Sequence, residues 1–253
     1  MARAYLRFYA ELNDLLPLDR RQVTFIHEFG GRPAVKDLVE ALGVPHTEVD
    51  LILANGDSVD FTYRVGDGDR LAVYPVFEAF DIGALARLRP APLREPCFVL
   101  DVHLGRLARL LRLLGFDSLY TNAASDPWLA RTSRTEHRIL LTRDRELLKR
   151  AEVTHGYCVR STHTREQLAE VMARFDLACA ARPFTRCLAC NGALESVDKG
   201  DVEQSLPPLV CARHHQFWRC KDCRRVFWKG SHHAELVRLV AAVTEMREEE
   251  AVL

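Results

Sequence analysis

Short apolar segments and polar turns alternate along residues 1–80, as in a domain of small strands around one helix. Apolar and polar positions alternate over 4–9 and again over 22–29, so both segments are predicted to be strands. A helix is predicted over 33–42, because Pro33 suits a first helical turn and Gly43 suits the residue after a helix.

Three further strands are predicted at 51–54, 58–65 and 71–76. An Asn55-Gly56 pair separates the first two, and a run of Gly and Asp at 66–69 precedes the third. The order of strand, strand, helix and strands is typical of a β-grasp fold. Residues 1–80 are therefore predicted to form a β-grasp domain.

Three prolines and three arginines punctuate residues 81–96, which favours a solvated linker. Strands and amphipathic helices then alternate over 97–181, so this part is predicted to be an α/β domain with a parallel sheet. Its predicted strands lie at 97–100, 118–121, 138–142 and 157–160.

The alternating pattern ends near residue 182, and two Cys-x-x-Cys pairs follow within 182–253. Two such pairs, 29 residues apart, let four thiolates surround one tetrahedral Zn²⁺. A site with four thiolates has no open position, so this zinc is predicted to be structural. The predicted ligands are Cys187, Cys190, Cys220 and Cys223, ahead of the alternatives Cys211, His214 and His215. A helix over about 234–246 is predicted to close this zinc ribbon.

Aromatic and basic residues are interleaved around the second cysteine pair. Such a pattern can stack on nucleic-acid bases and neutralise phosphates. The same aromatic residues can equally form the small core of the ribbon. Both interpretations stay open at this stage for Phe217, Trp218, Phe227 and Trp228.

The amino-acid composition is that of a globular protein rather than a disordered one. The chain has 253 residues, and its charged and apolar fractions, 28% and 48%, are those of a globular protein. We expect a cytoplasmic protein without a membrane span, because no signal peptide or long apolar run is present. The paired cysteines then favour metal over disulfides. Residues 1–80 hold 8 Lys or Arg against 13 Asp or Glu, whereas the remainder holds 27 against 22.

Carboxylates follow the predicted strands of the α/β domain. Asp101 comes directly after the segment 97–100, Asp144 follows 138–142, and Asp126 opens the helix between them. Ligands of open α/β sheets bind outside the carboxyl ends of strands, where carboxylates suit Mg²⁺ or Mn²⁺. The alternative for Asp101 and Asp144 is that each only caps the helix that follows it.

Basic residues near these carboxylates are candidates for phosphate contacts. Arg106, Arg109 and Arg112 recur every three residues on the first predicted helix, as a phosphate-binding ridge or as a solvated face would. Arg143, next to Asp144, is a further candidate, and we take Arg106, Arg109 and Arg143 as the predicted contacts to nucleic-acid phosphates.

Four ordered motifs resemble the Mut-seven C-terminal RNase family: "FVLDVHLGRLARLLRLLGFDSLY", "RILLTRDREL", "RCLACNGALE" and "FWRCKDCRRVFWKGSHH". The resemblance implies a PIN-like nuclease fold with an appended zinc ribbon. It also implies that residues 1–80 are the ubiquitin-like domain carried by bacterial members. By this resemblance, Asp101, Asp126 and Asp144 match the acidic positions of the family, although Ala123, Ala124 and Ser125 stand where it usually has further acids.

The resemblance implies a metal-dependent ribonuclease that hydrolyses RNA phosphodiester bonds with Mg²⁺ or Mn²⁺ held by the three aspartates. The alternative is an RNA-binding or ribosome-associated adaptor whose acidic site does not cut. The acidic β-grasp domain is expected either to lie against the basic remainder or to recruit a protein partner through its sheet edge. It can also be a passive module that only aids solubility.

Overall fold

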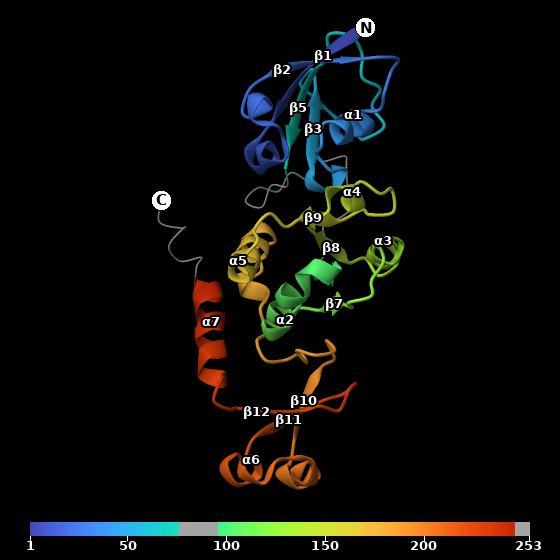
Figure 1. The fold of residues 1–253 in the computed structure, drawn as a ribbon. Coiled ribbons are helices and arrows are strands. Elements are labelled where there is room, and N and C mark those ends of the chain that lie inside the picture. Colours follow the sequence, from blue (N-terminus) through green and yellow to red (C-terminus); the bar gives the residue numbers. More distant parts are fainter. Residues whose placement is uncertain (76–95, 246–253) are drawn as a thin grey trace. The chain divides into compact units, whose positions relative to one another are not determined.

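The computed structural model describes residues 1–75 and 96–245, and these form two compact units (Figure 1). The first unit holds the N-terminal domain and residues 124–158. The second unit begins at Pro96, runs to Ala123 and resumes at Val159. The predicted linker, 81–96, lies outside the described residues except for Pro96.

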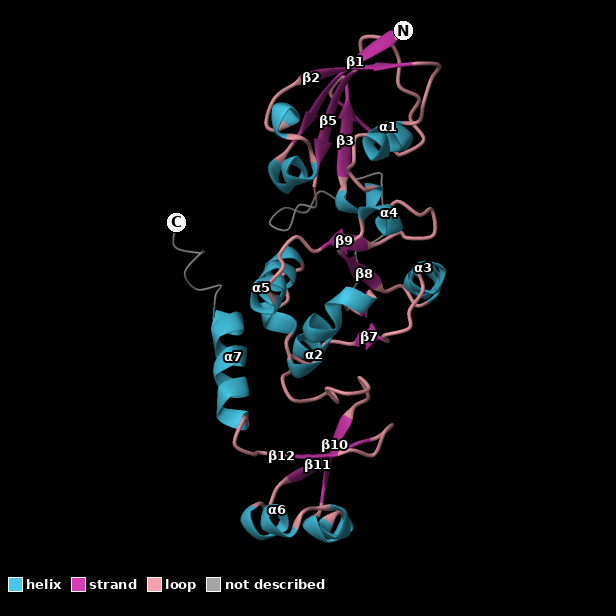
Figure 2. Ribbon diagram, viewed as in Figure 1, coloured by secondary structure: helices cyan, strands magenta, loops and turns pink. Residues whose placement is uncertain are grey.

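The N-terminal domain is a five-stranded sheet in the order β2-β1-β5-β3-β4 with one α-helix (Figure 2). Strand β1 pairs antiparallel with β2 and parallel with β5, so the chain ends of the domain meet in the middle of the sheet. Its strands are β1 (Ala2–Phe8), β2 (Phe25–Phe29), β3 (Leu51–Ala54), β4 (Asp57–Val59) and β5 (Arg70–Tyr74). Its helices are α1 (Val35–Ala41) and the 3-10 turns η1 (Ala10–Leu15), η2 (Leu18–Arg20) and η3 (His46–Glu48).

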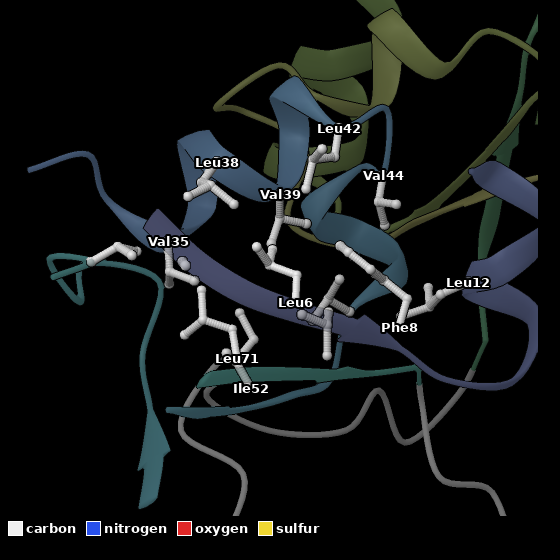
Figure 3. Close-up of a cluster of buried hydrophobic side chains, with 14 of the residues drawn as sticks. Leu6, Phe8, Leu12, Val35, Leu38, Val39, Leu42, Val44, Ile52 and Leu71 are labelled. Atoms are coloured by element: carbon white, nitrogen blue, oxygen red, sulfur yellow. The ribbon is translucent and has the colours of Figure 1, made fainter. Parts of the chain in front are cut away.

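The core of this domain lies between the sheet and α1. Val39 of α1 points toward Leu6 of β1, as Figure 3 shows, and Leu38 and Phe8 belong to the same cluster of buried side chains. The predicted turn between β3 and β4 forms with positive φ at Asn55 (54°) and Gly56 (99°), the conformation that a two-residue hairpin requires. The predicted strand 58–65 is shorter than expected, because the Asp60 carboxylate binds the amide and hydroxyl of Thr62 and turns the chain.

Residues 124–158 of the first unit continue the α/β pattern. They form α3 (Asp126–Thr135), β8 (Ile139–Thr142), α4 (Arg145–Leu148) and β9 (Gly156–Cys158). Strands β8 and β9 pair in parallel, with Leu140 opposite Gly156. Every residue of both strands is buried, as parallel strands covered on two faces require.

The second unit contains another parallel pair and the ribbon. Strands β6 (Phe98–Leu100) and β7 (Ser118–Tyr120) are parallel and are joined by η4 (Val102–Leu104) and α2 (Gly105–Leu113). Helix α5 (Thr164–Arg174) packs on α2 and is followed by η5 (Ala178–Ala180). The Phe98 ring of β6 meets Phe175, at the end of α5, edge to face at 5.8 Å between centroids.

The ribbon is an antiparallel sheet in the order β10-β11-β12, followed by α7. Its elements are β10 (Leu194–Val197), η6 (Lys199–Asp201), η7 (Glu203–Ser205), α6 (Pro208–Arg213), β11 (Phe217–Cys220), β12 (Val226–Trp228) and α7 (His233–Glu245). The predicted fold class is thereby confirmed: a β-grasp domain, parallel α/β strands, and a ribbon with a closing helix. The predicted domain boundaries stay predictions.

Candidate acidic site and four-cysteine centre

Asp101 lies at the C-terminal end of β6, where the chain turns into η4 and α2. Its Oδ1 accepts a 2.6 Å hydrogen bond from the amide of His103, and the residue is only 5% exposed. At the start of α2, Gly105 leaves room for the Tyr120 ring of β7, with which a side chain at this position would collide. The capping role left open by the sequence is confirmed for Asp101.

Asp144 follows β8 by two residues and caps α4. Its Oδ1 accepts a 2.8 Å hydrogen bond from the amide of Glu146, and its own amide donates to Oγ1 of Thr142 at 2.9 Å. The residue is exposed, and within the described part of the chain its Oδ2 makes no hydrogen bond or ion pair. Asp144 therefore caps a helix with one carboxylate oxygen and presents the other to solvent.

Asp126 is the first residue of α3, and its carboxylate is exposed. It lies in the same unit as Asp144, whereas Asp101 belongs to the second unit. The meeting of these three carboxylates around one or two ions stays a prediction from the sequence.

Of the arginines on α2, only two have the exposure that a phosphate contact needs. Arg106 and Arg109 are exposed, as is Arg143 after β8. Arg112 is 3% exposed, so it is not part of a solvated ridge. Its guanidinium instead donates to the carbonyl oxygens of Ser118 (2.9 Å), Leu188 (3.2 Å) and Ala189 (3.0 Å).

The four predicted cysteines gather at the ribbon end of the second unit. Their sulfurs all lie within 4.8 Å of one another, with 3.7 Å between Cys187 and Cys223 and 3.4 Å between Cys190 and Cys220. A tetrahedron with metal–sulfur bonds of about 2.3 Å has edges of about 3.8 Å, so the cluster fits one tetrahedral ion. Disulfides are excluded for these pairs, because the sulfurs lie well beyond the bonding distance of about 2.05 Å.

The backbone beside the cluster requires a glycine at position 192. A side chain at Gly192 would meet Cys220 Sγ at 2.9 Å and the carboxylate of Asp222, so only glycine fits behind the sulfurs. The alternative ligands Cys211, His214 and His215 are not in this cluster; among the residues described, it comprises the four cysteines alone.

The surroundings of the cluster raise the pKa of two of its thiols and lower that of a third. Burial raises the pKa of Cys187, and it raises the pKa of Cys220 to about 12. Burial also acts to raise the pKa of Cys190, but the Gly192 amide and the neighbouring thiols outweigh it and bring this pKa to about 7. A bound cation offsets the cost of holding buried thiolates together, because metal binding replaces their protons.

The first cysteine pair is joined to β7 by polar contacts that the sequence did not suggest. Asn191 accepts a 2.9 Å hydrogen bond from the Ser118 amide and donates one of 2.8 Å to the Asp117 carboxylate. Arg186 lies 3.4 Å from the same carboxylate and donates to the carbonyl oxygens of Gly115 and Asn191. The ribbon is thus built onto the α2–β7 segment. In the sequence, the Cys-Asn-Gly order after the first pair is the feature that could have marked Asn191 as a structural residue.

Comparisons with known proteins give the family. Residues 96–240 match the model of the Mut7-C RNAse domain, and residues 1–81 match that of the Mut7-C ubiquitin domain. The chain therefore belongs to the Mut7-C RNAse family, with a ubiquitin-like domain before the RNAse domain. Both parts of the predicted resemblance are confirmed.

Two solved structures resemble the N-terminal part of the chain. The "small archaeal modifier protein 1" of H. volcanii is 21% identical, with a TM-score of 0.25 over 30% of this chain and 98% of that chain. A second structure, "SAMP1 from Haloferax volcanii", is 20% identical, with a TM-score of 0.25 over 31% of this chain and 100% of that chain. No curated protein matches the chain. Within the described residues, no helix has the length and apolar character needed to cross a membrane.

Proposed function

We propose that the chain is a metal-dependent ribonuclease that hydrolyses phosphodiester bonds of RNA. The observation that carries the proposal lies inside the matched RNAse domain: Asp101 and Asp144 each follow a buried parallel strand at its carboxyl end. This is the position at which α/β sheets bind their ligands. Asp126, exposed in the first turn of α3, is the proposed third carboxylate.

The donor set suits a hard cation, because all three side chains offer carboxylate oxygen. When bound, Mg²⁺ or Mn²⁺ would supply Lewis-acid activation of water and neutralise charge on the phosphate. Asp101 is held by its cap and by burial, so it is suited to fix the position of a ligand. Oδ2 of Asp144 faces solvent and is the atom proposed as its metal ligand.

Exposed arginines are the proposed contacts to the RNA backbone. Arg106 and Arg109 present guanidinium groups on α2 beyond Asp101, and Arg143 precedes Asp144. Arginine binds phosphate oxygens in a two-pronged geometry, which would orient the scissile bond.

Incubation of the purified chain with single-stranded RNA and Mn²⁺, with analysis of the product ends, tests this function. Metal-dependent products that carry a 5′-phosphate are expected from PIN-like chemistry. Binding of RNA without any cleavage would favour the RNA-binding or ribosome-associated adaptor instead.

For the cysteine centre we propose Zn²⁺ with a structural role. Four sulfurs at tetrahedral spacing favour zinc over the oxygen-seeking cations. None of these four cysteines forms a disulfide, which suits a reducing compartment such as the cytoplasm.

We also propose that the ubiquitin-like domain recruits a protein partner through its β2 edge. The support is an exposed apolar pair across β1 and β2: Tyr5 is 41% exposed and its cross-strand partner Ile26 is 53% exposed. Edge strands with apolar neighbours favour pairing with another chain. Ile26→Glu should abolish co-purification of such a partner, and unchanged co-purification would exclude this edge.

A further inference from the structure

A cavity of about 660 Å³ lies in the second unit, beside the ribbon. Strands β11 and β12, the segment before the first cysteine pair and the start of α7 all contribute to its wall. Its volume is within the range of about 300–1,000 Å³ that small-molecule sites occupy. Four aromatic residues line it: Phe184, Trp218, Phe227 and Trp228.

The ribbon's aromatic residues serve its core and the cavity wall, and Trp228 contributes to both. Phe217 is fully buried and packs with Val202 and Leu206, so it belongs to the ribbon's small core. Trp218 and Phe227 are cross-strand partners, and both are half-buried in the cavity wall. Neighbouring residues of a strand face opposite sides, so Trp218 points away from the side that Phe217 fills.

Basic groups accompany this aromatic wall. Lys229 lines the cavity, is exposed, and holds its Nζ 5.7 Å from the centre of the Trp218 ring. His233, also in the wall, stacks on Phe184 at 5.1 Å between ring centres. The segment 217–233 carries five Lys or Arg against Asp222 alone. Glu195 of β10 pairs with two of them, at 3.2 Å from Arg219 and 3.9 Å from Arg224. The bases that favour an anionic partner are therefore Lys221, Arg225 and Lys229.

We propose that this cavity binds an unstacked base of single-stranded RNA. Trp218 and Phe227 provide the stacking surface, and Lys229 lies beside the phosphate that follows the base. Aromatic faces combined with cations are the combination that single-stranded nucleic acids require. An apolar peptide would use the aromatic wall but would gain nothing from the basic surroundings. The inference rests on the proposed function, since it takes RNA as the substrate and adds a second point at which the chain holds it.

Binding without cleavage separates this inference from the nuclease proposal. The full chain is titrated into a fluorescent oligouridylate without added Mg²⁺ or Mn²⁺ and without chelator, so that the cysteine centre keeps its metal. Trp218→Leu should weaken binding by about 5- to 100-fold, the effect of losing one stacked base. Leu209→Ala, which removes a 69% exposed apolar side chain from the same ribbon, should leave the affinity unchanged.

Lys229→Gln provides a second variant, on an exposed side chain outside the buried core of the ribbon. It should reduce the slope of log affinity against log salt concentration by about one, as the loss of one phosphate contact requires. Metal content verifies that each variant has kept its ribbon. Ultraviolet crosslinking of the wild-type chain to the same RNA, which needs no variant, should label Trp218, Phe227 or a neighbour in the cavity wall.

The two proposals fail in different ways. Wild-type affinity in a metal-replete Trp218→Leu variant, or crosslinks confined to other parts of the chain, would overturn the base-binding cavity. The nuclease proposal would survive that result if the wild type still cleaves RNA. A wild-type chain that does not bind the oligouridylate would also overturn the cavity proposal, whatever its activity on other RNA.

Discussion

The side-chain oxygen of Asn191 accepts a 2.9 Å hydrogen bond from the backbone amide of Ser118. Asn191 follows the first cysteine pair, and Ser118 begins β7, which pairs with β6, the strand directly before Asp101. Both residues are buried. The four-cysteine cluster and this part of the RNAse domain therefore share one hydrogen-bonded connection, and the ribbon is not an independent appendage.

Replacement of Asn191 tests that connection. Asn191→Ala should destabilise the fold by about 1–3 kcal/mol, because the Ser118 amide and the Asp117 carboxylate lose their buried partner. Asn191 has a φ of 78°, so Asn191→Gly is the matched control: it loses the hydrogen bonds but tolerates that backbone. Urea unfolding should rank wild type above Gly above Ala. An Ala variant as stable as the wild type would contradict this connection.

The cysteine centre should contain about one zinc ion per chain. Cys190→Ser should release the metal, whereas Cys211→Ser should retain it, because Cys211 lies outside the cluster. Loss of the metal from Cys190→Ser should also speed hydrogen exchange in β7, because Arg112, Arg186 and Asn191 connect the cysteine cluster to that strand. Elemental analysis of chelator-free protein and hydrogen exchange measure both effects. Retention of zinc by Cys190→Ser would show that the cluster is assigned wrongly.

Asp69 should make the ubiquitin-like domain sensitive to acid. Burial acts to raise its pKa, but hydrogen bonds from the Gly66 amide, Asn55 and Tyr63 outweigh it, so the pKa lies below its ordinary 3.8. The folded state thus binds this proton less readily than the unfolded state. The stabilisation is present above the unfolded pKa and is lost as pH falls through the lowered folded value.

Asp69→Asn should therefore cost about 1 kcal/mol at neutral pH, and the difference from wild type should vanish in acid. Asp57→Asn, at an exposed position in the same domain, is the control and should have little effect at either pH. Urea unfolding at neutral pH and at about pH 3 measures the difference. A cost for Asp69→Asn that persists unchanged in acid would exclude the carboxylate as its source.

A buried carboxylate links the ubiquitin-like domain to β9. Glu48 is fully buried, and its Oε1 accepts a 2.5 Å hydrogen bond from the Cys158 amide. Beside it, His46 Nε2 lies 2.8 Å from the Val153 carbonyl oxygen, which only accepts, so this nitrogen carries the proton. These contacts tie η3 to residues 153–158 within the first unit.

Glu48→Ala should lower the free energy of unfolding by about 1–3 kcal/mol, because it leaves the Cys158 amide buried without an acceptor. Glu48→Gln should cost less, since its amide oxygen can still accept that hydrogen bond. Thermal unfolding gives the ranking, and exchange of the Cys158 amide locates it. Equal stability of the Ala and wild-type chains would show that this hydrogen bond contributes nothing.

The sequence predicted those elements of the fold that depend on residues close together in the chain. Apolar runs located β6 and β8, the Asn55-Gly56 pair located a hairpin, and the paired cysteines located the four-cysteine cluster. In each case the deciding residues are neighbours in sequence or repeat a known spacing. The strand predicted at 58–65 failed after Val59, because a single Asp60 side chain competes there for the backbone of Thr62.

Contacts between residues far apart in the chain could not be predicted from the sequence. Arg112 shares the three-residue spacing of Arg106 and Arg109, so periodicity gave all three the same interpretation. It is buried because the carbonyl oxygens of Leu188 and Ala189, some 76 residues away, satisfy its guanidinium. The Glu48–Cys158 hydrogen bond likewise joins residues 110 positions apart. Such partners become identifiable only when the fold brings them together.

The two roles of Asp144 can be separated by the choice of substitution. Asn caps helices about as well as Asp, so Asp144→Asn should preserve the bond to the Glu146 amide while it removes the charge. Asp144→Ala should lose both and cost a further ~1 kcal/mol of stability. The same reasoning applies to Asp101→Asn and the His103 amide. Asp201→Asn, at an exposed position in the ribbon, is the control for loss of one negative charge.

The rate of Mn²⁺-dependent cleavage of end-labelled single-stranded RNA by these variants tests the ribonuclease proposal most directly. Asp101→Asn and Asp144→Asn should each cut at least about 100-fold more slowly than the wild type, with unchanged unfolding transitions and RNA affinity. Asp201→Asn should cut at the wild-type rate. Wild-type cleavage by Asp101→Asn or Asp144→Asn would show that the carboxylate serves only as a helix cap, and would contradict the proposed site.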